Sequence, residues 1–355
     1  MPLTVIDVLY PRDLGTIALR GNVAPLSWER SVEPVTVTSL PDGDHHLFEL
    51  DLPEGELVEF KAMRGETFWS CERNYSLLAG DKLTVAPYFH QGTGVLTDTK
   101  VVPSPELGFD VEMRVFLPPS YDEHRTKRYP VLYAHDGQAL FARAPDPGDP
   151  HSWRMDDALN QLYDYGVIEE LIVVAVTTKE HRVRMLSPTK DPSYGGGEAD
   201  RYLQFLIETL KPHVDARWRT LRGRESTAMI GASMGGLFSF YAAWSRSDVF
   251  GRVACLSPSF WWDNRAMIHE VQTYCAAPRP WLYIDSGAAL SQFEQDGSAR
   301  DGFDHTQAMC KSLLRHCYEP GQSLVTLTFA GFQHDASAWA ARLALPLQLL
   351  FPRRG

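Results

Sequence analysis

The chain has 355 residues, of which 34 are basic and 45 acidic, so its formal net charge is −11. This length is sufficient for two domains, and a hydrophobic content of 44% is sufficient for a sizeable buried core. The acidic balance argues against nucleic acid and anionic membranes as partners. No apolar run approaches the roughly 18 residues of a membrane helix, and the first residues lack a secretory-signal pattern. We therefore expect a globular, cytoplasmic protein.

Residues 1–97 carry short segments of alternating polar and apolar residues, among them GTIALRG, VTVTSL and HHLFELDL. Gly, Pro, Asp and Asn separate these segments, which predicts a small all-β sandwich. From residue 98 to 355, compact apolar runs such as LIVVAV and STAMIGAS alternate with helix-length patterns. That alternation predicts an α/β domain with a mostly parallel sheet covered by helices on both faces. The boundary is expected in GTGVLTDTKVVPSPELG, where Pro and Gly concentrate.

The cysteines form an odd set of five with no C-x-x-C pair. Such a set indicates neither a disulfide framework nor a zinc site, so we expect reduced thiols. One of them lies inside the apolar run RVACLSPS and is expected to be a core residue. The five are Cys71, Cys255, Cys275, Cys310 and Cys317.

The segment GASMG at residues 231–235 matches the G-x-S-x-G pattern of a nucleophile elbow. A strand-like TAMI precedes it and a helix-like GLFSFYAAWSR follows, which is the context the pattern requires. The turn strains the backbone of the nucleophile, and Gly231 and Gly235 remove side chains that would clash with the neighbouring strand and helix. We therefore predict that Ser233 is a nucleophile; the alternative is a small residue in a crowded turn.

A serine hydroxyl is a weak nucleophile until a base takes its proton, and in this fold the histidine comes later in the chain. Of the histidines after Ser233, His269 comes too early and His316 lies in a helical pattern. His305 and His334 remain. His334 follows a strand-like run in TFAGFQHDASAW and precedes the terminal helix, so it is the predicted base; the alternative is a surface loop histidine.

The third member of such a site is a carboxylate that orients the imidazole, expected in the loop after the strand WLYIDSG. The residues alone leave this choice open. One candidate ends the strand and could equally cap its turn, while four others lie in the long loop that follows. The candidates are Asp285, Glu294, Asp296, Asp301 and Asp304.

Acyl transfer also needs hydrogen-bond donors for the oxyanion, and the backbone N–H after the nucleophile, at Met234, is the first. The second is expected in the loop VLYAHDGQALF, at Gln138 or at Gly137, because Asp-Gly permits a tight turn. Asp136 in this loop is a candidate substrate-binding residue. The alternative is that Asp136 and His135 brace the loop.

Three segments, YPVLYAHDGQALF, GASMGGLFSFYAAWSRSDVFGRVACLSPSFWWD and GFQHDASAWAARL, together resemble the putative esterase family. This family includes enterochelin esterases, esterase D, feruloyl and acetylxylan esterases and mycolyltransferases. The resemblance covers about residues 105–352 and implies an α/β-hydrolase fold, a Ser-acid-His mechanism and no metal or organic cofactor. Carried over, Ser233 matches the nucleophile and His334 the base.

For the acid, RDGFDHT resembles the esterase D segment that completes the triad, so the resemblance favours Asp301, with Asp285 and Asp304 as alternatives. The chain departs from its relatives at HRVRMLSP. Relatives often have Arg-x-x-Glu-Tyr there, whereas Met185 and Leu186 stand here after Arg182. The substrate-positioning role of that glutamate is therefore not carried over.

Two pairs of tryptophans are candidates for ligand contact. Trp261 and Trp262, in SFWWDN, follow the strand after the nucleophile and are predicted to bind substrate, with a core role for one of them as the alternative. The front segment resembles starch-binding-type modules and the sandwich that precedes enterochelin esterases. Trp28 and Trp69 are therefore candidates to stack on a sugar. The alternatives are core packing and a module that roofs the active site.

Together these patterns predict a serine carboxylic-ester hydrolase that forms an acyl-enzyme on a siderophore-type or carbohydrate ester. Its expected partner is a small-molecule ester, with carbohydrate as a second candidate at the front module. Two alternatives remain: an acyltransferase with the same triad, and a catalytically silent carbohydrate-binding protein on a hydrolase scaffold.

Overall fold

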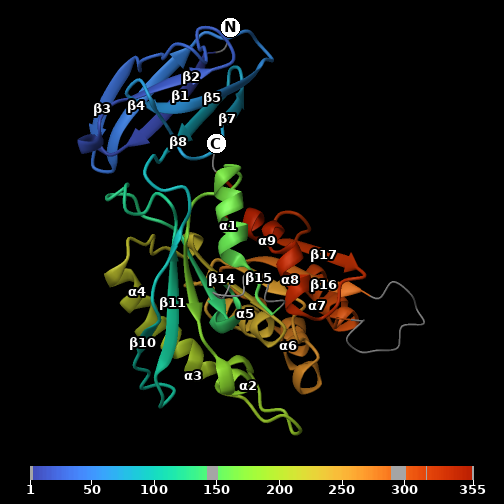
Figure 1. Ribbon diagram of the computed structural model, residues 1–355. Helices are drawn as coiled ribbons and strands as arrows, with labels where there is room; N and C mark the ends of the chain where they lie inside the picture. The colour runs from blue at the N-terminus through green and yellow to red at the C-terminus, as the bar shows by residue number, and fades with distance from the viewer. Residues whose placement is uncertain (1–2, 142–150, 289–300, 317, 354–355) are drawn as a thin grey trace.

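The computed structural model describes residues 3–141, 151–288, 301–316 and 318–353. Its first eight strands form two small sheets packed face to face, at the top of Figure 1. One sheet has the order β3-β4-β1-β8, and the other has β2-β5-β6 with β7 beside β5. The strands are β1 (Thr4–Tyr10), β2 (Ile17–Gly21), β3 (Thr36–Leu40), β4 (Gly43–Leu50), β5 (Leu57–Arg64), β6 (Phe68–Trp69), β7 (Tyr75–Leu78) and β8 (Lys82–Val85).

The sandwich forms because its strands alternate between buried and more exposed residues. In β1, Ile6, Val8 and Tyr10 are fully buried, and the residues between them are partly exposed. Side chains of successive strand residues point to opposite faces, so one face of β1 enters the core between the sheets. Phe48 and Phe60 from the two sheets meet that face in one hydrophobic cluster.

The remaining strands form one large sheet with the order β10-β11-β13-β12-β14-β15-β16-β17, and β9 pairs with β11. The strands β12 to β17 run parallel, while β9, β10 and β13 pair with β11 in antiparallel fashion. Their bounds are β9 (Val95–Leu96), β10 (Lys100–Val102), β11 (Val111–Leu117), β12 (Val131–His135), β13 (Ile172–Val176), β14 (Thr227–Ala232), β15 (Arg252–Leu256), β16 (Trp281–Ala288) and β17 (Leu324–Ala330).

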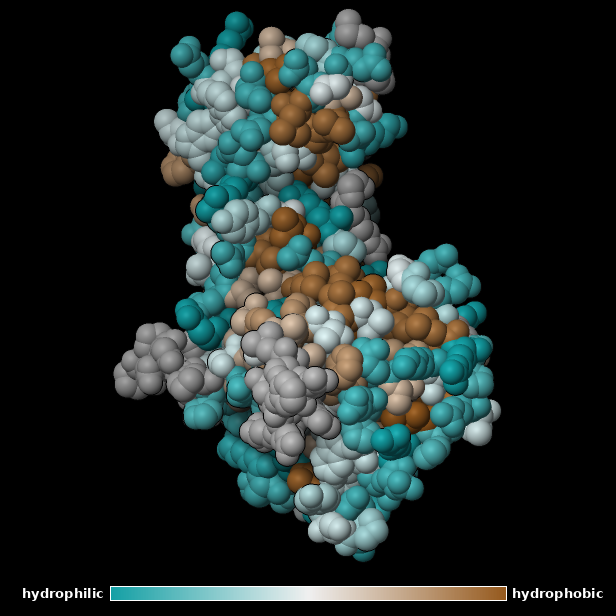
Figure 2. Space-filling view, turned by 90° about the vertical axis from the view of Figure 1, so that its right-hand side faces the viewer, coloured by the Kyte–Doolittle hydropathy of each residue, from teal (hydrophilic) through white to brown (hydrophobic). Residues whose placement is uncertain are grey.

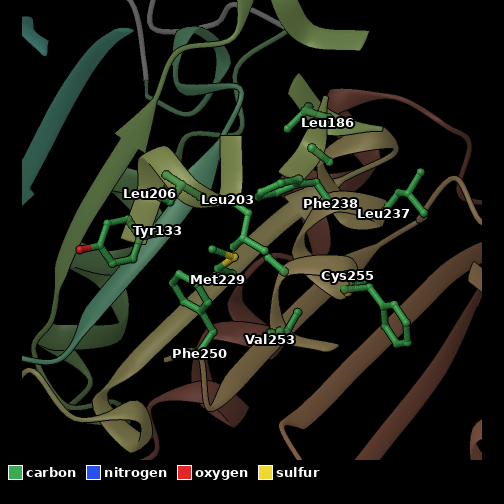
Figure 3. Packing of buried hydrophobic residues seen from close by; sticks show 14 of the residues in the cluster. Tyr133, Leu186, Leu203, Leu206, Met229, Leu237, Phe238, Phe250, Val253 and Cys255 are labelled. Atoms are coloured by element: carbon green, nitrogen blue, oxygen red, sulfur yellow. The ribbon is translucent and has the colours of Figure 1, made fainter. Parts of the chain in front are cut away.

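Helices cover both faces of this sheet, which is why its central strands are apolar throughout. In β12, Val131 and Tyr133 face one core, and Leu132 and Ala134 face the other. Figure 3 shows side chains of the first core, among them Tyr133 and Met229 of the sheet and Phe238 of helix α5. The helices are α1 (Met155–Asp164), α2 (Arg182–Leu186), α3 (Ala199–Gln204), α4 (Lys211–Arg217), α5 (Met234–Ser245), α6 (Trp262–Thr273), α7 (Phe303–His316), α8 (Ala336–Arg342) and α9 (Ala344–Leu350).

The boundary between the two units lies earlier than the sequence predicts. Strand β9 belongs to the large sheet, although the predicted boundary at residue 97 assigns it to the sandwich. The pairing of Phe116 and Leu117 with β9 extends the edge of the large sheet. The sandwich therefore ends in the connection between Val85 and Val95.

A buried glutamate joins the two units. Oε1 of Glu123 accepts a hydrogen bond from the Tyr10 hydroxyl at 2.6 Å. Its Oε2 accepts from the N–H groups of Phe89 at 2.8 Å and His90 at 3.1 Å. Hydrogen bonds to a buried carboxylate are worth more than neutral ones, so this contact fixes the sandwich on the large unit.

This junction lies at the amino-terminal edge of the parallel strands. Glu123 precedes β12, and Asp164, which pairs with Arg73 of the sandwich at 2.7 Å, ends the helix before β13. In Figure 1, α1 reaches up toward the sandwich, and Figure 2 shows hydrophobic residues running down the upper unit and across the top of the lower one. Ser233 follows the carboxyl end of β14, a strand length or roughly 20 Å away. The described contacts of the sandwich with the large unit therefore lie at the opposite end of the parallel strands from Ser233.

The expectation of reduced thiols is wrong for one cysteine. Cys275 is disulfide-bonded, whereas Cys71, Cys255 and Cys310 are free. Cys255 is fully buried in the core of the large unit, as its apolar context predicts. Among the described helices, none is long and apolar enough to cross a bilayer.

The junction also encloses a cavity of about 310 Å³ with an acidic group in its wall. Glu72 is buried there, and its Oε1 accepts a hydrogen bond from the Tyr75 hydroxyl. Its Oε2 has no partner among the described residues. Burial raises the pKa of Glu72 to about 7, because the loss of water around the carboxylate outweighs the hydrogen bond from Tyr75, which lowers the pKa.

We predict that Glu72 makes stability depend on pH. Because the pKa of Glu72 is about 7 in the folded state and near the ordinary glutamate value of 4.5 when unfolded, its stabilising effect is present below pH 4.5 and lost as the pH rises through 7. Relative to Glu72→Gln, the wild type should therefore lose about 3 kcal/mol of unfolding free energy between pH 4.5 and pH 8. Urea denaturation at both pH values measures this difference. Glu66→Gln, at an exposed position, is the control, and an equal difference at both pH values would contradict the prediction.

Candidate active site

Three residues predicted to act together follow three strands of the large sheet at the same edge. Ser233 lies between β14 and α5, and His334 lies between β17 and α8. Asp301 lies between β16 and α7. Because these strands are parallel, their carboxyl ends share one edge, where the three side chains meet.

Hydrogen bonds connect the three side chains in series. His334 Nε2 lies 2.9 Å from Ser233 Oγ, and His334 Nδ1 lies 2.6 Å from Asp301 Oδ1. The imidazole is 30% exposed, whereas the side chain of Asp301 is fully buried. The ring of Trp339 meets the imidazole edge to face at 5.2 Å. The histidine is thus oriented on one side by a buried carboxylate and open to solvent on another.

The backbone at Ser233 has the strained conformation of a nucleophile elbow. Its φ is 57° and its ψ is −121°, a conformation that residues with a side chain rarely adopt. The strain is held by packing, because a Cβ on Gly231 would lie 2.4 Å from the backbone of Gly235. The prediction for Gly235 needs correction. A Cβ there would make only ordinary contacts, at 3.5 Å, so Gly235 is the backbone against which Gly231 packs.

The structure separates the candidate acids. Asp301 Oδ2 accepts hydrogen bonds from Ser257 Oγ at 2.5 Å and from the N–H of Gly287. Asp285, the alternative at the strand end, is fully buried and pairs with Arg342 at 3.1 Å. Burial raises the pKa of Asp285, and the Arg342 guanidinium opposes that rise.

Three candidates for the acid and one for the base remain. Asp304 lines the cavity beside Ser233, and Glu294 and Asp296 lie outside the described residues. His305 also lines this cavity, and its pKa is lowered by burial and by the charge of Arg265. The hydrogen bond to Ser233 is made by His334.

A cavity of about 500 Å³ opens beside Ser233 and His334. Trp261 lines it and is 37% exposed, as a substrate-contacting residue requires. Trp262 is buried and donates from Nε1 to the Thr189 carbonyl at 2.8 Å, so substrate contact through Trp262 is a wrong prediction. The described lining is Ser233, Ser257, Pro258, Ser259, Trp261, Gly302, Phe303, Asp304, His305 and His334.

Sequence reasoning missed Tyr194. This exposed residue lies edge-on to Trp261, a residue of the cavity wall, with ring centroids 5.7 Å apart. Three glycines with positive φ, at 195–197, follow it and let the chain turn back sharply. The run YGGGE is the signal that could have marked this loop.

The loop after β12 packs against the first turn of α5. Gly137 opens a 3₁₀ turn, and a Cβ there would lie 2.8 Å from the backbone of Ala175 on β13. Gln138 is fixed by its side chain, whose Oε1 accepts from the Thr178 N–H at 3.2 Å. Met234 is the first residue of α5, where helices leave N–H groups without intrahelical partners. Both predicted oxyanion donors therefore lie on rigid turns of neighbouring strands.

Asp136 holds this loop in place through its side-chain hydrogen bonds. Its carboxylate accepts hydrogen bonds from Arg182 Nε at 2.9 and 3.0 Å and from Thr178 Oγ1 at 2.5 Å. These bonds occupy the carboxylate, and the backbone of Asp136 is left-handed, with φ of 59°. The described contacts of Asp136 therefore favour the alternative, in which this residue stabilises the loop, over substrate binding. His135 is buried, which lowers its pKa to about 4 and keeps the imidazole neutral.

The described residues contain no group of three His, Cys, Asp or Glu side chains arranged to hold a metal ion. The chemistry that the described residues offer at this edge is that of a hydroxyl, an imidazole and a carboxylate.

The sequence matches the family described as Putative esterase over residues 104–346, more than half of the chain. The chain belongs to this family. Among curated proteins, this family member is 27% identical to the uncharacterized protein YbbA of Bacillus subtilis, over 48% of this chain and 66% of that one. It is 30% identical to the siderophore triacetylfusarinine C esterase of Aspergillus fumigatus, over 46% of this chain and 56% of that protein. It thus spans less than two thirds of either relative.

Among solved structures, the ferric enterobactin esterase of Salmonella typhimurium is similar, with a TM-score of 0.55 and 16% identity. The similarity covers 94% of this chain and 88% of that one, so it includes the sandwich. At this identity it shows the fold alone. The predicted α/β-hydrolase fold with a preceding β domain is confirmed, and so is the resemblance to putative esterases of the enterochelin esterase type.

We predict that Gly231→Ala destabilises this family member by at least about 2 kcal/mol, because the added methyl group overlaps the backbone of Gly235. The elbow would have to open, so Ser233 should also lose its alignment with His334. Urea denaturation measures the free energy of unfolding. Gly223→Ala is the matched control, since its Cβ would meet nothing within 4 Å. Equal stability of the two variants would contradict the packing argument.

Proposed function

We propose that this protein is a serine carboxylic-ester hydrolase that uses Ser233 as nucleophile, His334 as general base and Asp301 as the orienting acid. The observation that carries the proposal is the unbroken series of hydrogen bonds from Asp301 through His334 to Ser233. Serine hydrolases of unrelated folds share this arrangement. Membership of the putative esterase family supports the reaction class.

In the proposed first step, Ser233 Oγ attacks the ester carbonyl carbon while His334 Nε2 takes the hydroxyl proton. Asp301 remains ionised and stabilises the imidazolium through Nδ1–H. The tetrahedral intermediate then collapses, His334 returns the proton to the leaving alkoxy group, and the acyl group stays on Ser233. Water, deprotonated by His334, attacks the acyl-enzyme in the same way and releases the carboxylic acid.

The backbone N–H groups of Met234 and Gln138 are the proposed oxyanion donors. The first opens α5, whose dipole favours negative charge at that end. The second is on the turn that Asp136, Thr178 and Arg182 brace. Donors that need no rearrangement stabilise a developing oxyanion most effectively.

The proposed substrate is a small ester of the siderophore or carbohydrate type. The 30% identical relative from Aspergillus fumigatus is a siderophore esterase, which supports the first class. The described wall of the cavity contains Asp304 and neither Lys nor Arg, which favours a weakly charged ester over a strongly anionic one. Trp261 and Phe303 offer apolar surface to an acyl group. Products formed with competing alcohols would distinguish hydrolysis from the alternative, acyl transfer.

We predict that Ser233→Ala lowers kcat on p-nitrophenyl acetate at least about 10³-fold, because no acyl-enzyme can form. A fluorophosphonate probe should label the wild type at Ser233 and leave the variant unlabelled. Ser259→Ala is the matched control, because Ser259 Oγ lies 3.3 Å from Ser233 Oγ in the same cavity. That variant should label normally. Unchanged turnover in Ser233→Ala would reject the proposal, and wild-type turnover no faster than the uncatalysed reaction would favour a silent binding protein.

A second proposed function is carbohydrate binding by the sandwich. Trp28 and Trp69 are 38% and 39% exposed, and their rings lie 6.3 Å apart at 45°. Arg20 lies over the Trp69 ring at 5.5 Å and also donates to the Trp28 carbonyl at 3.4 Å, so it links the two tryptophans. Because this pair lies on the unit docked at the far edge of the sheet, a bound sugar would anchor the protein to a carrier and would not enter the reaction site.

We predict that a Trp28→Ala, Trp69→Ala double variant loses at least about tenfold in affinity for a soluble α-glucan, since stacking on each ring is worth about 1 kcal/mol. Affinity electrophoresis measures the binding. Tyr274→Ala, an exposed aromatic residue of the large unit, is the control. Turnover of a soluble ester should be unchanged in all three proteins. Wild-type migration unaffected by the glucan would reject carbohydrate binding.

A further inference from the structure

We propose that Arg342 and Asp285 form a charge-neutral pair that positions the carboxylate of Asp301 and thereby sets the lower pH limit of the reaction. The inference rests on the proposed roles of Ser233, His334 and Asp301. Both residues act through Asp301 and contact neither Ser233 nor substrate, so they are positioning residues.

The pair is joined to Asp301 beneath the site. Nη2 of Arg342 lies 3.1 Å from Asp285 Oδ1 and 3.6 Å from Asp301 Oδ2. The same nitrogen donates to Ser257 Oγ at 2.5 Å, and that hydroxyl donates to Asp301 Oδ2 at 2.5 Å. One guanidinium nitrogen therefore holds both carboxylates, directly and through a hydroxyl.

The network is inaccessible to water. The side chains of Asp285 and Asp301 are 0% exposed, and that of Arg342 is 1% exposed. Nε and Nη1 of Arg342 have no hydrogen-bond partner among the described residues. The rings of Phe329 and Phe332 lie 5.3 and 5.9 Å from the guanidinium carbon. Burying the Arg342 guanidinium costs free energy, and its contacts with the two carboxylates offset that cost.

Chain connectivity couples this network to the base. His334 lies just before Asp335, the N-cap residue of α8, and Arg342 is the last residue of that helix. Asp335 caps the helix by accepting from the Ala338 N–H at 2.8 Å. The imidazole and the guanidinium are therefore held at the two ends of one short rigid element, facing the same carboxylate.

The charges indicate what the pair does. With Asp285 and Asp301 ionised, the network carries two negative charges and one positive, and protonation of His334 makes the sum zero. Loss of the Arg342 charge leaves an extra carboxylate, which makes the imidazole easier to protonate. Loss of the Asp285 charge leaves an extra cation, which makes it harder to protonate. A role in packing alone would not give effects of opposite sign.

Other groups near His334 stay the same in every variant. Asp301 faces Nδ1, Ser233 faces Nε2 and Trp339 lies edge to face. Asp335 is adjacent in the chain, and its carboxylate is engaged at the cap of α8. From α7, Asp304 and His305 line the same cavity, with Arg265 of α6 near His305. Differences between variants therefore report on the pair.

The test is the pH profile of kcat/KM in four variants. We expect the acid limb of Arg342→Met to move up by about half to one pH unit and that of Asp285→Asn to move down by a similar amount. The double variant should return close to the wild type, and Arg342→Lys should shift less than Arg342→Met. Asp248→Asn, which breaks a surface pair with Arg246, is the control and should not shift.

Labelling of Ser233 by a fluorophosphonate separates this inference from the proposed function. If the wild type labels at Ser233 but the acid limbs of Asp285→Asn and Arg342→Met coincide or move together, the inference is overturned and the function stands. If Ser233→Ala keeps full turnover, the function itself fails, and the inference with it. If Arg342→Met does not fold, two other variants test the inference. The acid limb of Asp285→Asn should move down in pH, and adding Arg342→Gln to that variant should move it back; if it does not, the inference is overturned.

Discussion

The strained turn at Ser233 is the constraint on which the rest of the site depends. A positive φ at a residue with a side chain persists only where the surroundings enforce it, and here Gly231 packs directly on the backbone of Gly235. This contact sets the start of α5 and directs the hydroxyl away from the sheet. His334 and Asp301 follow the carboxyl ends of β17 and β16, so the spacing of these strands sets the distance between the two side chains. The turn thus costs conformational energy that the packing of β14 and α5 offsets.

The junction between the two units and the three side chains around Ser233 lie at opposite ends of the parallel strands. The junction at Glu123 and Asp164 lies where the parallel strands begin, and the hydroxyl, imidazole and carboxylate lie where they end. The sandwich therefore cannot shape the described wall of the cavity next to Ser233. Any influence it has on the choice of substrate must come from binding a carrier or from the stability of the joined units.

Local patterns predicted much of the fold and of the site, and long-range contacts account for the rest. The elbow is readable because a strand, a glycine pair and a helix lie within twenty residues, and burial on both faces makes the strands apolar. The choice between Asp285 and Asp301 was not readable from the residues, because it depends on which of the two carboxylates reaches His334 in the folded chain. Trp261 and Trp262 are adjacent, and contacts from distant segments, among them the carbonyl of Thr189, bury Trp262. The disulfide at Cys275 was hidden because sequence spacing does not encode proximity.

A buried carboxylate that must stay ionised needs its second oxygen satisfied as firmly as its first. His334 engages one oxygen of Asp301, and the N–H of Gly287 and the hydroxyl of Ser257 engage the other. These neutral donors leave the negative charge uncompensated when His334 is neutral. Arg342 supplies the compensation, but alone it would also disfavour the imidazolium on which the proposed mechanism depends. Asp285 cancels that effect because it pairs with the same guanidinium nitrogen. The buried pair thus gives Asp301 a fixed orientation without adding net charge to the site.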